Sequence, residues 1–245
     1  MKKFYNEVGE IMQRYFSNQI NDNIFTLSKD DSFHIEKVMR MKIGDLVEIV
    51  YDHETYISVI ESFHPVTCSI NKKTDENNEM NKKIIICQSL VNEQKMDFIL
   101  QKCTELGMYS FIPYKAVNSI IKVNDKMDKK IDRWQRIVKE ASEQSKRNII
   151  PEVKNVMNIN ELINYKADLK LICSTINDNK LKNVIREHHN YDTIMLVIGP
   201  EGGFDPHEEE MFINNGFIPV SLGKRILRTE TASLCALSQL NYEWW

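Results

Sequence analysis

The first third of the chain alternates apolar and polar positions with the two-residue period of a β-strand. Residues 46–51 and 56–63 are rich in β-branched and aromatic side chains, and a polar break, Asp52-His53-Glu54, separates them. This arrangement predicts a β-hairpin. A further short strand is predicted at residues 66–70.

A different pattern precedes the hairpin, where Ile35, Val38 and Met39 recur at the spacing of one helix face. Ser32 stands before them and belongs to the residue types that cap helix N-termini. We therefore expect a short helix that begins after Ser32 and ends at the turn formed by residues 43–45.

From residue 83 onward, continuous apolar runs alternate with segments of helical period. Strands are predicted at residues 83–90, 111–117, 169–173, 194–198 and 217–222. Helices are predicted at residues 96–106, 128–146, 206–215 and from Thr229 or Thr231 to the C-terminus. Continuous apolar strands are typical of a parallel sheet that is covered on both faces. This part of the chain is therefore predicted to be an α/β domain with a mostly parallel sheet.

The polar stretch NKKTDENNEMNKK at residues 71–83 has no apolar periodicity and is predicted to be a linker. It divides the chain into an N-terminal domain at residues 12–71 and a C-terminal domain at residues 82–245. Residues 1–11 contain few apolar side chains, so we expect them to be dispensable for folding and activity.

Composition narrows the class of protein. No apolar run reaches the roughly 18 residues that a membrane-spanning helix needs, and the N-terminus lacks the apolar core of a signal peptide. We therefore expect a cytosolic protein without a membrane partner. The five cysteines are widely spaced and show no metal-ligand spacing. The sequence thus predicts neither a metal site nor a disulfide framework.

The net charge of −3 argues against a uniformly basic nucleic-acid binder. Charge is uneven, however, because residues 115–147 carry ten Lys and Arg against five Asp and Glu. Such a basic stripe indicates either a specific binding face or a well-solvated helix surface.

Two glycine-containing loops follow predicted strands. The first is GPEGG at residues 199–203. Small molecules bind at the carboxyl ends of strands in open α/β sheets, and glycines there let a ligand approach the backbone. The loop has neither the dinucleotide pattern G-x-G-x-x-G nor the G-K-[ST] of a P-loop. On these residues alone it is either a loop for an unidentified ligand or a tight turn.

The second loop is SLGKRILRTETA at residues 221–232, which places Arg225 and Arg228 three residues apart before a predicted helix. Arginines beside a helix N-terminus form a site for anions or for negative charge that develops during a reaction. The alternative is a capped helix with arginines that point into solvent.

Segments along nearly the whole chain resemble the ribosomal RNA small subunit methyltransferase E family, the uridine N3-methyltransferases of 16S rRNA in the SPOUT superfamily. The segments are MQRYF (12–16), HIEKVMRMKIGD (34–45), QKMDFILQKCTELG (94–107), IPYKA (112–116), RWQRIVKEASEQSKRNIIPEV (133–153), GPEGGF (199–204) and LGKRILRTETA (222–232). One departure is Phe33-His34, where the family often has two histidines.

The resemblance implies a PUA-like β-barrel that helps bind RNA and a SPOUT domain whose C-terminal segment threads a trefoil knot. It implies S-adenosylmethionine as the cofactor, held by loops of the knot, and a homodimer. The residues implied for cofactor binding are Ser174, Gly199, Pro200, Glu201, Gly203, Leu222, Gly223, Ile226, Leu227 and Thr231.

The implied reaction suggests roles for charged residues. Removal of the proton from N3 of uracil spreads negative charge to O2 and O4, which an adjacent arginine would stabilise. Arg228 is the first candidate and Arg225 the second. Glu201 and Glu230 are candidates for the proton acceptor, and the alternative for each is that it orients a loop. Glu230 is equally a candidate for helix capping, so the proton acceptor is left open. The candidates for RNA contact are Arg14, His34, Arg40 and Arg147.

The expected partner is 16S ribosomal RNA within the small ribosomal subunit. Two other interpretations stay open. One is another SPOUT RNA methyltransferase that modifies the ribose 2′-oxygen, and the other is a non-catalytic RNA-binding module with the same fold.

Overall fold

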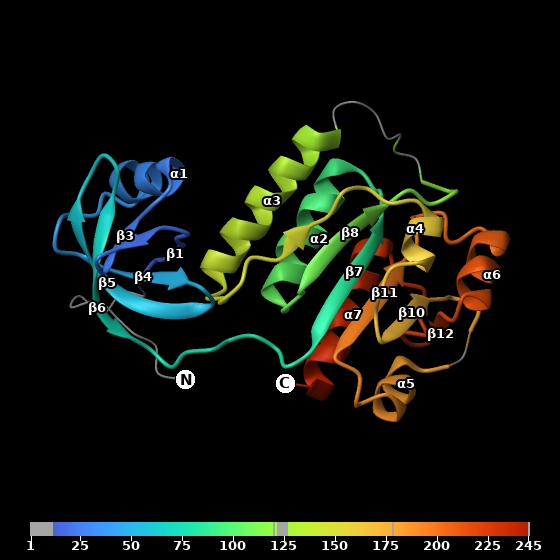
Figure 1. Ribbon diagram of the computed structural model, residues 1–245. Helices are drawn as coiled ribbons and strands as arrows, with labels where there is room; N and C mark the ends of the chain where they lie inside the picture. Colours follow the sequence, from blue (N-terminus) through green and yellow to red (C-terminus); the bar gives the residue numbers. More distant parts are fainter. Residues whose placement is uncertain (1–11, 120, 122–126, 178, 245) are drawn as a thin grey trace. The chain divides into compact units, whose positions relative to one another are not determined.

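The computed structural model describes residues 12–119, 121, 127–177 and 179–244 of the chain. These residues form two compact units, each with its own sheet (Figure 1). The first unit contains the chain up to Glu79 together with Ser142–Ile149, and the second contains Met80–Ala141 and Ile150–Trp245. Within the described ranges, no helix is both long and apolar enough to cross a lipid bilayer. The prediction that residues 1–11 are dispensable concerns a segment outside the described residues.

In the first unit the described residues form a curled six-stranded sheet. Its strands are β1 (Arg14–Phe16), β2 (Ile20–Asn21), β3 (Ile24–Thr26), β4 (Leu46–Tyr51), β5 (Glu54–Ser62) and β6 (Thr67–Lys73). They follow the spatial order β1-β4-β5-β6-β3-β2, with β1 parallel to β4 and the other neighbours antiparallel. Tyr15, Phe25, Ile49 and Ile60 are buried in its core. The predicted N-terminal β-domain is confirmed.

The predicted hairpin is also confirmed, since β4 and β5 pair as antiparallel neighbours with Tyr51 opposite Glu54. Asp52 and His53 connect the two strands, and their φ angles are +48° and +66°. Two successive left-handed residues form the type of turn whose twist matches that of a hairpin. Asp and His tolerate this conformation better than β-branched residues do.

The helix predicted after Ser32 begins earlier in the structure. α1 spans Lys29–Phe33 and continues directly into a π-helical turn, η1, at His34–Val38. Ser28 is the capping residue, because its side chain accepts a hydrogen bond from the Asp31 amide. The prediction of Ser32 as the cap is therefore wrong.

The π-helical turn also changes which apolar residues are buried. Ile35 is buried, but Val38 and Met39 are 57% and 39% exposed. The Met39 amide donates to the His34 carbonyl, a five-residue step. This wider turn rotates later residues away from the face that a 3.6-residue period predicts.

The second unit contains a parallel sheet, which confirms the predicted α/β domain. Its strands are β7 (Lys83–Ser89), β8 (Ser110–Tyr114), β9 (Glu152–Val153), β10 (Leu169–Cys173), β11 (Thr193–Ile198) and β12 (Ile218–Val220). The spatial order is β12-β10-β11-β7-β8-β9, and every neighbouring pair is parallel. The predicted trefoil knot stays a prediction, because strand order alone does not test threading.

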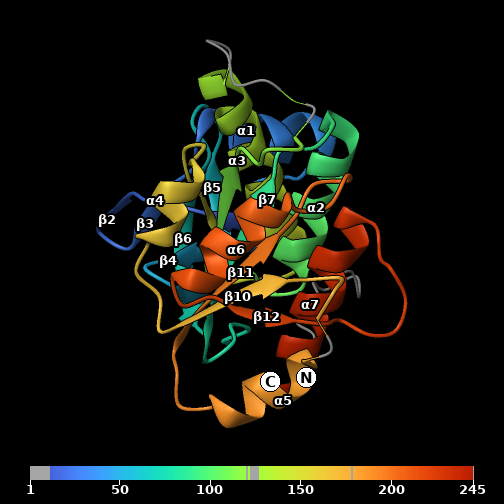
Figure 2. The same cartoon turned by 90° about the vertical axis from the view of Figure 1, so that its right-hand side faces the viewer.

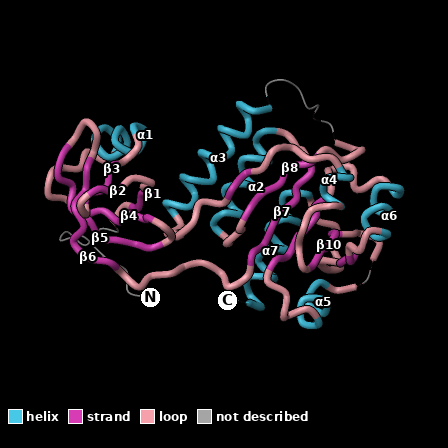
Figure 3. The backbone as a smooth tube through the Cα atoms, viewed as in Figure 1, coloured by secondary structure: helices cyan, strands magenta, loops and turns pink. Residues whose placement is uncertain are grey.

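Helices cover both faces of this sheet (Figure 3). α2 (Glu93–Glu105), α3 (Met127–Gln144), α5 (Leu181–Glu187) and α7 (Thr229–Trp244) pack on one face. α4 (Ile159–Ile163) and α6 (Pro206–Asn214) pack on the other. Successive residues of β7 point to opposite faces of the sheet. Ile84 and Ile86 pack on the face covered by α2, α3, α5 and α7, whereas Ile85 and Cys87 pack on the face covered by α4 and α6.

The unit boundaries differ from the predicted domains in two respects. The sequence placed residues 142–149 in the C-terminal domain, whereas in the structure Ser142–Ile149 belongs to the first unit. The predicted linker is also shorter than expected, because β6 continues to Lys73 and the following residues up to Glu79 stay with the first unit.

Candidate functional site

The candidate site is built from three loops in the second unit. They follow β10 at residues 174–177, β11 at residues 199–203 and β12 at residues 221–228. Because β12, β10 and β11 are adjacent parallel strands, their carboxyl ends reach the same edge of the sheet (Figure 2). Ligands collect at this edge in open α/β folds.

Two adjoining cavities lie among these loops. The larger has a volume of about 570 Å³ and is bordered by the loops after β10 and β11 and by both ends of α6. The smaller has a volume of about 90 Å³ and is bordered by the loops after β10 and β12. Cys173, Thr175 and Ala232 line both, so the two cavities meet at the loop after β10. A volume of roughly 300–1,000 Å³ is typical of small-molecule sites.

Glycines shape the loops in two ways. Gly203 and Gly223 have φ angles of +76° and +141°, and a Cβ at either position would meet no atom within 4 Å. They are therefore required by the backbone conformation, and they leave open space beside the main chain. A Cβ at Gly199 would lie 2.9 Å from the Phe204 ring, so this position excludes side chains by contact.

A chain of buried hydrogen bonds joins β7, the loop after β11 and the start of α7. The Gln88 side-chain amide donates to Thr229 Oγ1 at 2.8 Å, and Thr229 Oγ1 donates to the Gly199 carbonyl oxygen at 2.7 Å. Ser233 Oγ donates to Gln88 Oε1 at 2.5 Å. Gln88, Thr229 and Ser233 are buried, and buried polar groups are costly unless they are paired. The chain of bonds therefore fixes the first turn of α7 against Gly199.

The loop after β8 supports the same region. The Asn118 side-chain amide donates to the Gly203 carbonyl oxygen at 3.2 Å, and the Val117 amide donates to Glu208 Oε1 at 3.3 Å. Glu208 is 1% exposed, and burial raises the pKa of its carboxyl above the ordinary value. The carboxyl also accepts a hydrogen bond from the Asp205 amide, which completes the capping box of α6.

Lys95 in the first turn of α2 contacts two acidic residues of the site. Its Nζ lies 2.6 Å from Glu201 Oε1 in the loop after β11 and 3.4 Å from Glu230 Oε2 in the first turn of α7. The hydrogen bond to Glu201 and then the interaction with Glu230 raise the pKa of Lys95 above its ordinary value. Lys95 therefore carries its positive charge at neutral pH.

Arg228 occupies the N-cap of α7, because its carbonyl oxygen accepts a hydrogen bond from the Ala232 amide at 2.8 Å. Its side chain is exposed. Arginine is a poor cap, since it has no side-chain acceptor for free amides and its charge meets the positive end of the helix dipole. A residue that local stability disfavours in a strand-end loop points to a function. Arg225 is also exposed and lines the smaller cavity.

Most of the residues implied for cofactor binding surround these cavities. Gly199, Pro200 and Gly203 line the larger cavity, and Ser174, Leu222, Gly223, Ile226 and Leu227 line the smaller. Glu201 and Thr231 line neither of these two cavities. Glu201 instead pairs with Lys95.

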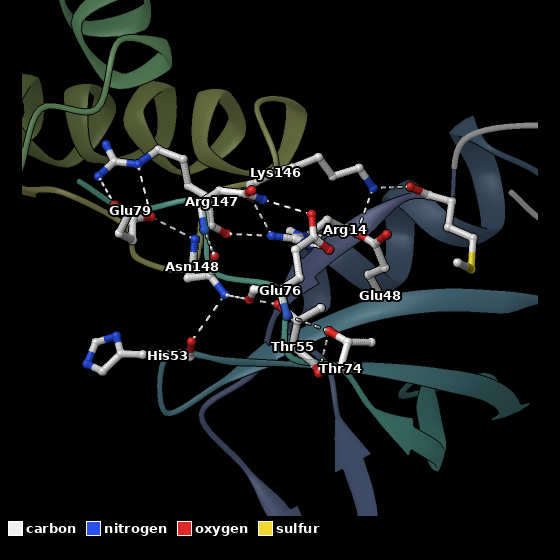
Figure 4. A network of polar contacts seen from close by, with 12 residues as sticks. Arg14, Glu48, His53, Thr55, Thr74, Glu76, Glu79, Lys146, Arg147 and Asn148 are labelled. Atoms are coloured by element: carbon white, nitrogen blue, oxygen red, sulfur yellow. Dashed lines mark hydrogen bonds and ion pairs between the residues drawn. The ribbon is translucent and has the colours of Figure 1, made fainter. Parts of the chain in front are cut away.

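Two residues implied for RNA contact are buried in the first unit (Figure 4). Arg14 is 2% exposed, and its guanidinium pairs with Glu48 at 2.9 Å and Glu76 at 3.0 Å. It also donates to the carbonyl oxygen of Lys146, whose own ammonium lies 2.7 Å from Glu48. The Arg14 guanidinium is thus already bonded to two carboxylates and a carbonyl oxygen, so the geometry favours a structural role over RNA contact.

Arg147 belongs to the same network. It is 3% exposed and pairs with Glu79 at 2.5 Å. Its neighbour Asn148 receives a hydrogen bond from the Asn78 amide and donates to the Glu76 carbonyl oxygen, as Figure 4 illustrates in part. The network binds residues 146–148 to residues 76–79, in the middle of the predicted linker, so the geometry favours a structural role for Arg147 as well.

The other two residues implied for RNA contact are more accessible. Arg40 is exposed and has a φ angle of +54°. His34 is half-buried, and its Nδ1 lies 3.0 Å from Tyr15 Oη. Burial raises the pKa of Tyr15 well above its ordinary value, so this phenol remains a neutral partner for the imidazole.

The basic stripe is partly neutralised within the structure. Arg133 pairs with Asp97 and with Glu93, Lys146 pairs with Glu48, and Arg147 pairs with Glu79. Among the described residues, no three His, Cys, Asp or Glu side chains gather as metal ligands do.

Sequence reasoning missed several residues of the site. Gln88, Lys95 and Asn118 were not assigned roles, although each bonds to a loop or helix that lies more than 80 residues away. Gln88 carries the clearest available signal, because it directly follows the apolar run Ile84 to Cys87 in a predicted buried strand and therefore needs a buried partner.

Comparison with known proteins agrees with this geometry. Residues 78–241 match the family model described as RNA methyltransferase domain. The chain is 34% identical to the ribosomal RNA small subunit methyltransferase E of Bacillus subtilis (strain 168), over 95% of this chain and 97% of that protein. It is 35% identical to the enzyme of the same name from Buchnera aphidicola subsp. Schizaphis graminum, over 100% of this chain and 98% of that protein.

A solved structure extends the comparison to the fold. The crystal structure of a ribosomal RNA small subunit methyltransferase E from Neisseria gonorrhoeae bound to S-adenosyl methionine is 30% identical in sequence. It aligns with a TM-score of 0.87 over 95% of this chain and 98% of that chain. The alignment thus spans both units. The chain belongs to the ribosomal RNA small subunit methyltransferase E family.

Proposed function

We propose that this protein transfers a methyl group from S-adenosylmethionine to N3 of a specific uridine in 16S ribosomal RNA. The observation that carries the proposal is the pair of adjoining cavities at the carboxyl edge of the parallel sheet, bordered by the loops that contain the family's motifs. The family membership, over nearly the full length of the chain, supports the same reaction.

The residues present fit an adenosyl group. Gly203 and Gly223 have open space beside the main chain, so a ligand can reach the polar backbone atoms there without meeting a side chain. The apolar lining from Ile198, Phe204 and Leu227 suits a purine ring. When bound, S-adenosylmethionine supplies a methyl group on a sulfonium, an electrophile that needs no metal. Gly199, Pro200, Gly203, Leu222, Gly223 and Leu227 would hold it.

Arg228 is proposed to act on the uracil. N3 becomes nucleophilic as its proton is removed, and the resulting negative charge spreads to O2 and O4. A guanidinium on the N-cap of α7 meets that charge together with the positive end of the helix dipole. Arg225, exposed on the same loop, is the second candidate for this contact.

Glu230 fits a positioning role better than that of the proton acceptor. Its carboxylate faces Lys95 at 3.4 Å, and this ion pair joins the first turn of α7 to α2. We therefore propose that Glu230 orients the first turn of α7, and that Glu201 does the same for the loop after β11.

The substrate implies further properties. We propose that Arg40 and His34 of the first unit contact the RNA, that the enzyme is a homodimer and that it acts in the cytoplasm, where ribosomal subunits assemble. Exposed Ile176 and Ile226, 84% and 86% accessible beside the two cavities, are apolar surface that a second copy would cover.

Transfer of a tritiated methyl group from S-adenosylmethionine to RNA tests the proposal. Small-subunit RNA should become labelled, and the label should co-migrate with N3-methyluridine after digestion to nucleosides. Label on the ribose would instead support a 2′-O-methyltransferase. Binding of RNA without any transfer would support a non-catalytic module.

A further inference from the structure

Lys95 joins two segments that are far apart in the sequence. Glu201 is 106 residues away in the loop after β11, and Glu230 lies in the first turn of α7. Both carboxylates lie within 3.4 Å of the same Nζ atom. Glu201 flanks Gly199, Pro200 and Gly203, which line the larger cavity, and Glu230 follows Arg228 by two positions. Lys95 thus links the cofactor loop to the helix turn that follows Arg228.

The backbone holds Lys95 in place for this contact. The Lys95 amide donates to the Asn92 side-chain oxygen, the N-cap of α2, at 3.0 Å. A lysine in the first helical turn is unfavourable, because its charge lies near the positive end of the helix dipole. Local helix stability therefore does not explain why a cation stands at this position.

An ordinary surface ion pair is the competing explanation, and α2 offers one for comparison. Lys102 pairs with Glu105 at 2.7 Å, three residues along the same helix. Such pairs contribute little. Lys95 differs because its two partners come from two other segments that both belong to the site.

We propose that Lys95 is a positioning residue for methyl transfer, which holds the loop after β11 and the first turn of α7 together through Glu201 and Glu230. This inference rests on the proposed function. The charged groups placed against Lys95 are Glu201 from that loop and Glu230 from α7, with Glu93 and Asp97 of its own helix directed to Arg133. Without the ammonium, the two carboxylates would repel each other and separate the segments.

The repulsion gives Lys95→Met an expected defect in cofactor binding. The affinity of Lys95→Met for S-adenosylmethionine should be about tenfold lower than the wild-type affinity at pH 8.

The experiment combines calorimetry with hydrogen exchange of the cofactor-free protein. The reporters are the Gly203 amide, which is bonded to the Pro200 carbonyl oxygen, and the Ala232 amide, which is bonded to the Arg228 carbonyl oxygen. Both amides should exchange faster in Lys95→Met at pH 8. Lys95→Arg should restore wild-type behaviour, and Lys102→Met is the matched control that should change neither measurement.

The double variant Lys95→Met/Glu201→Gln separates this account from a general loss of stability. Only one carboxylate then remains, so the affinity at pH 8 should recover in part. The proposal is overturned if Lys95→Met behaves like Lys102→Met at pH 8, or if the double variant is as impaired as the single one. If the wild-type protein does not bind S-adenosylmethionine, the proposed function fails, while the exchange comparison still decides the role of Lys95.

Discussion

Thr229 Oγ1 donates a hydrogen bond of 2.7 Å to the carbonyl oxygen of Gly199. This bond connects the first residue of α7 with the first residue of the GPEGG loop, and Gln88 supports it from β7 at 2.8 Å. Arg228 directly precedes Thr229. The residue proposed to stabilise charge on the uracil is therefore fixed relative to the loop proposed to hold the cofactor.

Thr229→Val removes this bond and keeps the shape of the side chain. The Gly199 carbonyl and the Gln88 amide would each lose a buried partner, so the free energy of unfolding should fall by about 1–3 kcal/mol. Affinity for S-adenosylmethionine should fall about tenfold. Thr229→Ser keeps the hydroxyl and is the control. Calorimetry that finds equal affinities for the valine and serine variants would show that the bond does not organise the site.

Arg228→Ala should affect turnover more than binding. A contact that strengthens only as negative charge develops contributes to the transition state, so affinities for RNA and S-adenosylmethionine should stay near normal. The single-turnover rate should fall by roughly 100-fold or more, as when one oxyanion donor is removed. Arg228→Lys should recover only part of the rate, because an ammonium does not reproduce a planar guanidinium.

The opposite outcome would reassign the residue. If Arg228→Ala loses RNA affinity and keeps its single-turnover rate, Arg228 binds phosphate. Arg225, on the same loop, would then become the candidate for transition-state stabilisation.

Gly203→Val tests the loop after β11, with Gly216→Val as a matched control. Both glycines have left-handed φ angles, +76° and +85°, and a Cβ would meet no atom at either. Each variant should therefore lose stability through backbone strain, about 1–2 kcal/mol or more for a β-branched residue. Of these two glycines, only Gly203 lines the larger cavity. Gly203→Val should abolish S-adenosylmethionine binding, and Gly216→Val should leave it intact.

Equal calorimetric affinities of these two variants would remove the loop after β11 from the cofactor site. Thermal unfolding of both proteins, measured without cofactor, shows whether the two substitutions impose a comparable strain.

Arg14→Leu tests the structural role that the network in the first unit indicates. The substitution leaves Glu48 buried with only Lys146 as a cationic partner, so the free energy of unfolding should fall by about 3–5 kcal/mol. Arg186→Leu is the control, because Arg186 pairs with Glu243 at an exposed position, where a loss below about 1 kcal/mol is expected. If the Arg14→Leu protein has normal stability but binds RNA weakly, the result would support the predicted RNA contact of Arg14 instead.

Local patterns in the sequence predicted most of the second unit. Its strands are continuous apolar runs, and α6 carries its own start signal, because Asp205 and Glu208 form a capping box and Pro206 occupies the first turn. The hairpin was predictable for the same reason, since a polar break separates two runs of strand period. These features depend on residues that are neighbours in the sequence.

The contacts that organise the site depend on distant residues. Nothing near Lys95 in the sequence indicates Glu201 or Glu230, and the Gln88–Thr229 bond spans 141 residues. The ion pairs of Arg14 were not predictable for a related reason. Its partners Glu48 and Glu76 become neighbours only when β1 pairs with β4 and the polar stretch after β6 folds back. The residues next to Arg14 in the sequence therefore do not show that its guanidinium is buried among acidic partners.

Mass spectrometry of nucleosides from small-subunit RNA, isolated from cells with and without the gene, tests whether this protein methylates N3 of uridine in 16S ribosomal RNA. We expect N3-methyluridine at one position in the RNA from cells that have the gene, its loss without the gene, and no recovery with the Arg228→Ala variant. Unchanged N3-methyluridine in the RNA of both cells, or the loss of a ribose-methylated nucleoside instead, would rule out this function.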